Sequence, residues 1–571
     1  MYPYQDPNQP IEARIDDLLA RMTTEEKIAQ TDQYGSSDFT TVDENGRATS
    51  VDFDRLDELL GKRSVGSVQL RGMTAAQANA VQRYAVEQTR LGIPFLFSEE
   101  ALHGLYTGRA TSFPQQIGLA ASFEPALGYE MGRAVATEAR ACGIHETYSP
   151  VMDLIRDPRY GRGEESYGED TCLCAAFARE TVRGLQGNDI AAPDAVAAEP
   201  KHYVGYGMPV GGRNCAPTAM GRHEVYSDCL PVFEAAFRDA GACNTMCSYN
   251  AIDGVPVSSD HALLTDVLRG EFGMPGYVRA DMTAVSRLYD WHFTAETPQE
   301  AIRQGLTAGV DMELYDFPHE VWQGGIAELL ADGRLDPAVL DEACRRILRI
   351  KFRLGLFEHP YTDESREEKA LRCPDHLALA RKIAERSAVL LKNQGGLLPL
   401  SPAIGSVAVL GPGAAQAMLG DYSEARGRTG AVSVLDGIRA AVSPETRVLY
   451  ARGCNFLGES LHPFDPAYLQ DEDGNPGLTG RYYNGPTLCG TPVQTRTDRT
   501  VNFNWIFALP HPALDANCFS VAWTGTVTLP RDLDGCIGLS TQDSMRLYID
   551  DELLIDGWGP GKRADQAVDF L

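Results

Sequence analysis

The feature that most constrains the fold is a regular alternation, over residues 1–360, of short apolar runs with longer amphipathic stretches. The runs predict strands and the stretches predict helices. Predicted strands include 93–97, 195–198, 242–245, 276–278 and 310–312, and predicted helices include 124–142, 171–186, 222–240, 259–272 and 298–308. Such alternation builds a parallel sheet covered by helices. A (β/α)8-like barrel fits the length of this region, and a doubly wound sheet fits the pattern almost as well.

After residue 360 the pattern of apolar and polar residues changes twice. Residues 361–385 are polar and Pro-marked at their start, which indicates a linker that runs into the first helix of a second domain. Residues 386–475 contain a second α/β unit, with a buried strand expected within 406–413. From 476 to 571 the sequence shows short alternating runs that predict a β-sandwich or barrel module. The final residues, 569–571, fall inside a strand pattern, so we expect this module to be incomplete.

Charge and cysteine usage narrow the class of protein. The chain has 51 basic and 79 acidic residues, a net charge of −28, which argues against a nucleic-acid partner or an anionic membrane surface. We find no apolar run long enough to span a bilayer and no secretory signal at the start. The 13 cysteines are odd in number and lack zinc-site spacing. We therefore expect reduced thiols, a cytoplasmic location and no metal.

Polar side chains cluster directly after four of the predicted strands, where a parallel barrel builds its active site. These clusters are 97–104, 156–170, 201–207 and 276–282. Each has a plainer alternative: a helix N-terminus, a solvated loop, a core histidine and a helix cap, respectively. Together they describe a pocket of acids, arginines, tyrosines and a Lys–His pair, which suits a neutral polyhydroxylated ligand. Glycosidic bonds are cleaved by two carboxylates, one of them acting as an acid.

At this point the chain resembles glycoside hydrolase family 3. The segments that carry the resemblance are EALHG (100–104), SFPQQIGLAASF (112–123), RDPRYGRGEESYGED (156–170), KHYVGYG (201–207), MCSYN (246–250), the Asp281 segment and ILRIKFRLGLFE (347–358). The resemblance implies a barrel followed by an α/β sandwich domain, and exo-acting, retaining hydrolysis of β-glycosides without a cofactor. Residues 480–493 and 543–556 resemble a protective-antigen-like β module, which some members carry inside the second domain.

The resemblance also implies roles for individual residues. Asp281 matches the nucleophile, which would form a covalent glycosyl-enzyme. The matching substrate-binding residues are Glu100, Tyr148, Arg162, Lys201, His202, Arg222 and Tyr249. The family's acid/base glutamate follows the β insert. This chain ends within that insert, so no residue here is expected to fill the role.

Two departures from the family bear on specificity. The nucleophile lies in Ala280-Asp281-Met282, where the family usually has Ser-Asp-Trp or Ser-Asp-Cys. Glu100 stands where many glucosidases of the family have Asp. Its extra methylene leaves less room for a hydroxymethyl group, which favours a pentose by about 1–3 kcal/mol.

The substrate expected is therefore an oligosaccharide or an aryl or alkyl β-glycoside. We expect a β-xylosidase, with a β-glucosidase as the first alternative. A non-catalytic carbohydrate-binding protein is the alternative from another class, and a homo-oligomer is compatible with either. An N-acetylglucosaminidase of the same family fits less well, because Tyr206 replaces the second histidine of that branch.

Overall fold

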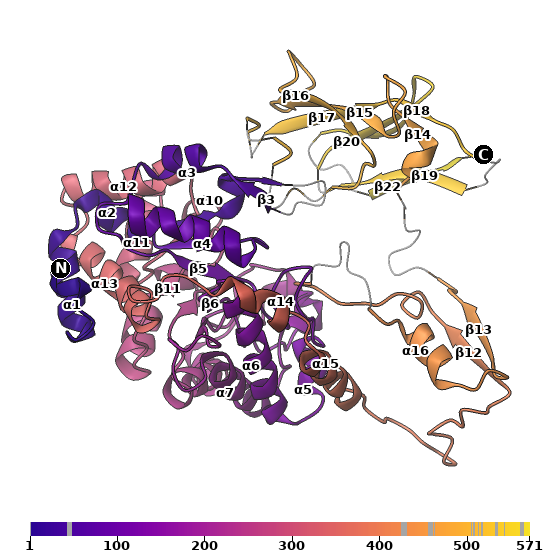
Figure 1. Cartoon of the computed structure of the whole chain (residues 1–571), viewed down its shortest axis with the longest axis horizontal. Coiled ribbons are helices and arrows are strands. Elements are labelled where there is room, and N and C mark those ends of the chain that lie inside the picture. The colour runs from indigo at the N-terminus through magenta and orange to yellow at the C-terminus, as the bar shows by residue number, and fades with distance from the viewer. Residues whose placement is uncertain are drawn as a thin grey trace. The chain divides into compact units, whose positions relative to one another are not determined.

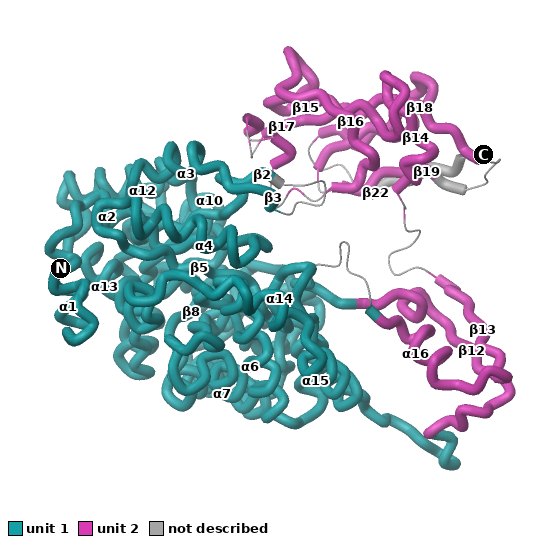
Figure 2. The backbone as a smooth tube through the Cα atoms, in the orientation of Figure 1, with its two compact units in different colours: residues 1–398, 419–431 teal, residues 399–418, 432–571 magenta. Residues whose placement is uncertain are grey.

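The computed structural model describes residues 2–42, 48–423, 431–454, 461, 463–503, 505, 509–511, 513–515, 518–530, 535–541, 543–559 and 565–570. The chain forms two compact units (Figure 2). Unit 1 comprises residues 1–398 and 419–431, and unit 2 comprises residues 399–418 and 432–571. Within the described ranges, none of the helices combines the length and the apolar character needed to cross a bilayer.

A parallel barrel forms the centre of unit 1 (Figure 1). Five parallel strands lie in the order β1 (Gln33–Gly35), β4 (Ser67–Gln69), β5 (Leu96–Glu99), β6 (Glu146–Thr147) and β7 (Ala197–Ala198), and β8 (Thr245–Met246) pairs in parallel with β11 (Val278–Arg279). Backbone hydrogen bonds continue the ladder: Asn244 N donates to Ala198 O (3.4 Å), Ala280 N to Met312 O (2.8 Å) and Glu313 N to Thr31 O (3.0 Å). The last bond joins segment 310–313 to the start of β1. The predicted barrel is thus confirmed over the doubly wound alternative.

Helices surround this barrel and follow the predicted ranges closely. The helices of unit 1 are α1 (Ile11–Arg21), α2 (Thr24–Gln30), α3 (Phe53–Leu60), α4 (Ala75–Arg83), α5 (Gln116–Ala120), α6 (Pro125–Ala141), α7 (Thr171–Gln186), α8 (Arg222–Glu224), α9 (Leu230–Glu234), α10 (Arg287–Asp290), α11 (Pro298–Ala308), α12 (His319–Ala331), α13 (Pro337–Arg353), α14 (Glu367–Ala370) and α15 (Pro374–Arg386). The predicted helix 222–240 comprises α8, η7 (Val225–Cys229), α9 and η8 (Ala235–Asp239), and the predicted helix 259–272 is η10 (Ala262–Glu271).

Close helix packing depends on glycine between α6 and α7. A Cβ on Gly184 would lie 2.4 Å from the carbonyl oxygen of Tyr129, and one on Gly132 would lie 2.8 Å from that of Thr181. Only a residue without a side chain fits at either position, because real Cβ contacts are longer. Helices α14 and α15, from the predicted linker 361–385, also pack against α6 in unit 1.

A fully enclosed ionic network lies inside the barrel. Arg279, at the end of β11, contacts Glu146 (Nη2 to Oε2, 2.5 Å) and Glu199 (Nε to Oε2, 3.1 Å), and all three side chains are wholly buried. Burial, and secondarily the adjacent Glu146, raises the pKa of Glu199 well above its ordinary value, although Arg279 opposes this shift. Burial thus favours the protonated form of Glu199, and Arg279 contacts both carboxyl groups.

Unit 2 contains an α/β part and a β module. In the first, β12 (Ser406–Leu410) and β13 (Arg447–Ala451) are parallel, and α16 (Val434–Ala441) lies between them in sequence. The strands of the module are β14 (Leu469–Gln470), β15 (Leu478–Asn484), β16 (Gln494–Asp498), β17 (Phe519–Thr524), β18 (Thr526–Val527), β19 (Gly535–Ser540), β20 (Met545–Ile549), β21 (Glu552–Gly557) and β22 (Asp565–Phe570). Their pairings are antiparallel. Asp550 and Asp551, between β20 and β21, have positive φ (49° and 66°) and make a hairpin turn.

Candidate active site

Asp281 lies just beyond the end of β11, and its two carboxylate oxygens have different surroundings. Oδ1 accepts hydrogen bonds from the Tyr249 hydroxyl (2.9 Å) and from the backbone nitrogen of Met282 (2.7 Å). Oδ2 is buried and makes no hydrogen bond with any described residue. A buried carboxylate oxygen without a partner is costly. This oxygen is therefore available to a group that enters from the pocket.

His202 stands beside that free oxygen. Its Nε2 lies 3.4 Å from Asp281 Oδ2, and its Nδ1 lies 2.7 Å from Asp153 Oδ2. Burial raises the pKa of Asp153 to about 7. Burial, and then the Arg162 cation, lowers the pKa of His202 well below its ordinary value. Both shifts favour the uncharged forms of the imidazole and the carboxyl group, which meet at the 2.7 Å contact.

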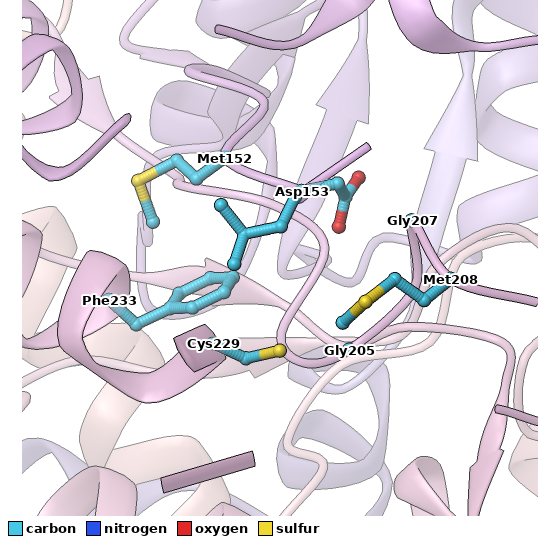
Figure 3. A pocket seen from close by; sticks show the side chains of 8 residues that line it. Met152, Asp153, Gly205, Gly207, Met208, Cys229 and Phe233 are labelled. Carbon is cyan, nitrogen blue, oxygen red and sulfur yellow. The ribbon is translucent and has the colours of Figure 1, made fainter. Parts of the chain in front are cut away.

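The environment of Asp153 explains its raised pKa. Met152, Met208, Cys229 and Phe233 line a small pocket next to it, together with Gly205 and Gly207 (Figure 3). A Cβ on Gly207 would lie 2.3 Å from the carbonyl oxygen of Leu154. This close approach explains the glycine at the end of KHYVGYG, and it helps to keep water from the carboxyl group.

Lys201 and Glu100 form a close ion pair. The Lys201 ammonium lies 3.0 and 2.7 Å from the two carboxylate oxygens of Glu100. Lys201 is almost fully buried, while 17% of the Glu100 side chain remains exposed. Burial raises the pKa of Glu100, and Lys201 opposes that shift. The pair presents donors and acceptors on neighbouring atoms, which suits the vicinal hydroxyls of a sugar.

Arg162 completes the polar wall. It makes a two-bond contact with Glu165, at 2.7 Å for each bond, and its Nη2 lies 3.3 Å from His202 Nε2. Because a guanidinium only donates, Nε2 of His202 accepts in this contact. The Tyr206 ring packs edge-on against His202, with centroids 4.9 Å apart. The guanidinium of Arg162 is thus held beside His202, the neighbour of Asp281.

The structure brings five other predicted residues to Asp281 and places two differently. Glu100, Arg162, Lys201, His202 and Tyr249 belong to one connected cluster. Tyr148 is buried in the barrel, where its hydroxyl bonds Ser98 (2.6 Å) and its ring lies 6.0 Å from the Lys201 ammonium. Arg222 is exposed at the start of α8. Among the described residues, no recorded contact ties Arg222 to Asp281, so its role in substrate binding stays a prediction.

Tyr422 is a site residue that sequence analysis missed. Its ring lies 5.1 Å from the Lys201 ammonium. The preceding Asp421 is anchored to unit 1, because its backbone carbonyl accepts from Gln115 (2.8 Å) and its backbone nitrogen donates to Glu164 (2.7 Å). Burial, and then the Glu100 carboxylate, raises the pKa of the Tyr422 phenol well above its ordinary value. The available signal was weak: a Gly-Asp pair before an aromatic residue, far outside the predicted barrel domain.

A second acidic cluster could in principle hold a metal ion. Asp32, Glu313 and His319 offer ligand atoms within 4.8 Å of one another. Those atoms already have protein partners: Asp32 contacts His319 (2.9 Å) and Gln323 (2.7 Å), and Glu313 accepts from Gln33 N and Asp316 N. Burial and the adjacent Asp32 raise the pKa of Glu313 well above its ordinary value. A carboxyl–carboxylate pair accounts for this cluster without an ion.

The arrangement around Asp281 suits nucleophilic attack by a carboxylate. Each neighbouring carboxylate that the structure describes is engaged: Glu100 with Lys201, Asp153 with His202 and Glu165 with Arg162. Among the buried carboxyl groups that the structure describes, Asp281 is the one with an oxygen that makes no hydrogen bond. The described residues therefore offer Asp281 as a candidate nucleophile, next to groups that can bind hydroxyls. The glutamate acid/base that the family resemblance places after the β insert stays a prediction.

Comparisons with known proteins agree with this architecture. The family model for the glycosyl hydrolase family 3 N terminal domain matches residues 23–350, and the PA14 domain model matches residues 474–569. The second match confirms the predicted protective-antigen-like module.

Curated relatives are named as β-xylosidases or as β-glucosidases. A putative β-xylosidase of Formosa agariphila is 34% identical over 420 residues, covering 72% of this chain and 54% of that protein. A periplasmic β-glucosidase of Salmonella typhimurium is 34% identical over 463 residues, covering 78% and 57%. This chain thus spans a little over half the length of these relatives.

Solved structures give the same fold. A β-glucosidase from Erythrobacter marinus matches with a TM-score of 0.72 at 36% identity, covering 79% of this chain and 59% of that one. A β-glucosidase from Listeria innocua, solved in complex with glucose, matches with a TM-score of 0.69 at 32% identity, covering 78% and 60%. With a family model over more than half of its length and the matching segments on one barrel, this chain belongs to glycoside hydrolase family 3.

Proposed function

We propose that the protein is a retaining, exo-acting β-glycosidase that releases a terminal β-D-xylose through a covalent intermediate on Asp281. The observation that carries the proposal is the unbonded Oδ2 of Asp281, which lies beside His202, itself in contact with Arg162. This oxygen attacks the anomeric carbon while the bond to the aglycone breaks, and water later hydrolyses the ester. Tyr249 and the Met282 backbone nitrogen hold the other oxygen, which orients the carboxylate.

The preference for xylose rests on Glu100. Lys201 fixes this longer acid toward the pocket, which leaves less space for the hydroxymethyl group of glucose. A pocket difference of one methylene is worth about 1–3 kcal/mol, so glucose would be a poorer substrate and not an excluded one. β-Glucosidase activity is the alternative, and relatives of both names support the broader class.

The test uses 2-deoxy-2-fluoro β-xylosyl and β-glucosyl donors with activated leaving groups. Such groups depart with little acid assistance, so the chain can be tested without an identified acid/base residue. We expect a stable adduct in the intact mass, mapped to the Asp281 peptide, that forms faster with the xylosyl donor. Faster labelling by the glucosyl donor would favour the β-glucosidase. No adduct on folded protein, with saturable sugar binding, would favour a non-catalytic carbohydrate-binding protein.

A further inference from the structure

Two arginines and a tryptophan gather on one flank of the candidate active site. The Arg287 guanidinium carbon lies 5.3 Å from the centre of the Trp291 ring, and that of Arg213 lies 5.6 Å from the same ring. Arg213 is exposed, Arg287 is half-buried, and 38% of Trp291 is exposed. Helix α10, with Trp291 as its C-cap, and the separate segment around Arg213 thus place two cations on one aromatic side chain that remains open to solvent.

This group is directly connected to the nucleophile. The Arg287 guanidinium also lies 4.8 Å from the centre of the Tyr249 ring, and the hydroxyl of that tyrosine donates to Asp281. A second connection runs through Asn214, next to Arg213, which accepts a hydrogen bond from the Tyr206 hydroxyl (2.5 Å). Tyr206 in turn packs against Tyr249 and His202. Tyr249 and Tyr206 thus connect the two cations to Asp281 and His202.

The charges of these two arginines are not neutralised by the described part of the chain. Arg156, Arg159 and Arg162, on the neighbouring loop, each pair with a carboxylate. By contrast, no ion pair with a described acid is found for Arg213 or Arg287. Arg287 donates only to the Thr283 hydroxyl (3.2 Å) through its Nε. Asp290 is the acid on the same helix, α10, and it is exposed. Two unpaired cations beside the pocket are notable in a chain of net charge −28.

We propose that Arg213, Arg287 and Trp291 form a leaving-group subsite that favours aglycones bearing a carboxylate. This inference rests on the proposed glycosidase function and adds a substrate class to it. The planar fork of arginine matches a carboxylate in two-bond geometry. The exposed Trp291 ring offers a face for stacking a sugar or aryl ring that carries the acid. A uronic acid unit or an aromatic acid linked to the sugar meets both requirements.

Binding measurements test the subsite without requiring turnover. Phenyl and 4-carboxyphenyl 1-thio-β-glycosides, as xylosides and as glucosides, would be titrated into the 571-residue chain by calorimetry. Each exposed charge pair contributes only modestly to binding. With two arginines we expect the carboxylated ligand to bind about three- to tenfold tighter, with the ratio falling as salt rises.

Substitutions locate the effect. Arg213→Met and Arg287→Met should each reduce the ratio toward one. Arg83→Met is the matched control, because Arg83 is an exposed arginine 5.6 Å from the Tyr361 ring in a different region. We expect that variant to keep the wild-type ratio. Arg213 is exposed, so its substitution should leave the fold intact, which circular dichroism would verify.

The possible outcomes distinguish a failure of the carboxylate subsite from a failure of the proposed glycosidase function. Equal binding of phenyl and carboxyphenyl glycosides by the wild type would refute the carboxylate subsite and leave the glycosidase proposal standing. A preference that survives in both arginine variants would equally refute it. Binding of none of the four ligands would count against the proposed function itself, and the subsite would fall with it.

Discussion

Two layers of charged side chains lie in the barrel, one above the other, and they have opposite properties. Glu199 and Arg279 belong to the lower layer, and Lys201 and Asp281 follow each of them by two residues in the upper layer. Because side chains alternate along a strand, residues two apart share a face. The lower layer is wholly enclosed and its charges are paired, whereas the upper layer leaves Asp281 Oδ2 unbonded.

This difference shows that the two layers contribute separately to stability and to reactivity. Bonds within the lower layer hold the ends of β7 and β11 together, so that the residues just above them arrive at fixed positions. The upper layer can then keep a costly unpaired oxygen, because the strand below and the two bonds to Asp281 Oδ1 position the carboxylate without it. Stability is concentrated in one layer, and reactivity in the next.

The largest expected effect concerns the upper layer. Asp281→Asn should reduce adduct formation with the fluorinated donors by more than about a thousandfold, because it removes the attacking oxygen. The thermal midpoint should not fall, since Oδ2 makes no hydrogen bond with the described residues. Mass spectrometry and thermal unfolding provide the two readouts. Asp290→Asn, at an exposed position nearby, is the control and should label normally.

The lower layer should show the reverse behaviour. Arg279→Met leaves Glu146 and Glu199 buried without their cation, which should cost about 3–5 kcal/mol of unfolding free energy. Denaturant titration would measure this loss, and adding Glu146→Gln with Glu199→Gln should recover part of it. Arg156→Met removes a half-exposed pair with Asp228 and should cost less than about 1 kcal/mol. Equal losses for the two arginine variants would contradict the two-layer description.

Asp153 gives a pH-dependent test of the same comparison. Its folded-state pKa, about 7, lies above the ordinary value of 3.8. Between pH 4 and 7 the carboxyl group therefore ionises in the unfolded chain before the folded one, which lowers the stability of the folded state as pH rises. Asp153→Asn lacks this penalty. Its stability relative to wild type should therefore rise across that window, by at most about 1.4 kcal/mol per pH unit, and level off above pH 7.

Thermal midpoints at several pH values would reveal this slope for Asp153→Asn. Asp157→Asn is the control, because the Arg159 side chain lowers the pKa of Asp157 to about 2, outside the window. Parallel curves for wild type and Asp153→Asn would show that the carboxyl group is not held protonated.

The smallest expected effect concerns the preference for xylose over glucose. Glu100→Asp shortens the acid that Lys201 holds, which should open space for a hydroxymethyl group. We expect the ratio of xylosyl to glucosyl labelling rates to fall by about tenfold or less, consistent with a methylene-sized difference. Glu169→Asp, at an exposed position on the neighbouring loop, serves as the control. An unchanged ratio in Glu100→Asp would separate sugar choice from this residue.

The sequence predicted the upper layer much better than the lower one. The order of strands and helices was readable, and helices such as α7 and α11 begin and end where expected. The strands, however, are shorter than predicted and lie closer to the carboxyl end of each run: β8 is Thr245–Met246 where 242–245 was predicted, and β11 is Val278–Arg279 where 276–278 was predicted. Glu146 and Glu199 were overlooked because their partner, Arg279, lies 133 and 80 residues away, and a hydrophobic pattern contains no sign of such a partner. The cytoplasmic location and the domain boundaries stay predictions.

Tyr422 has a practical consequence for how this protein is divided. The chain leaves unit 1 after residue 398, contributes to unit 2, and returns at 419–431 to place an aromatic ring beside Lys201. A fragment cut at the end of the barrel, or at the limit of the matching family model, keeps Asp281 yet loses that ring. The pocket is therefore not a property of the barrel domain as a transferable module, and domain exchange between relatives would have to carry both segments together.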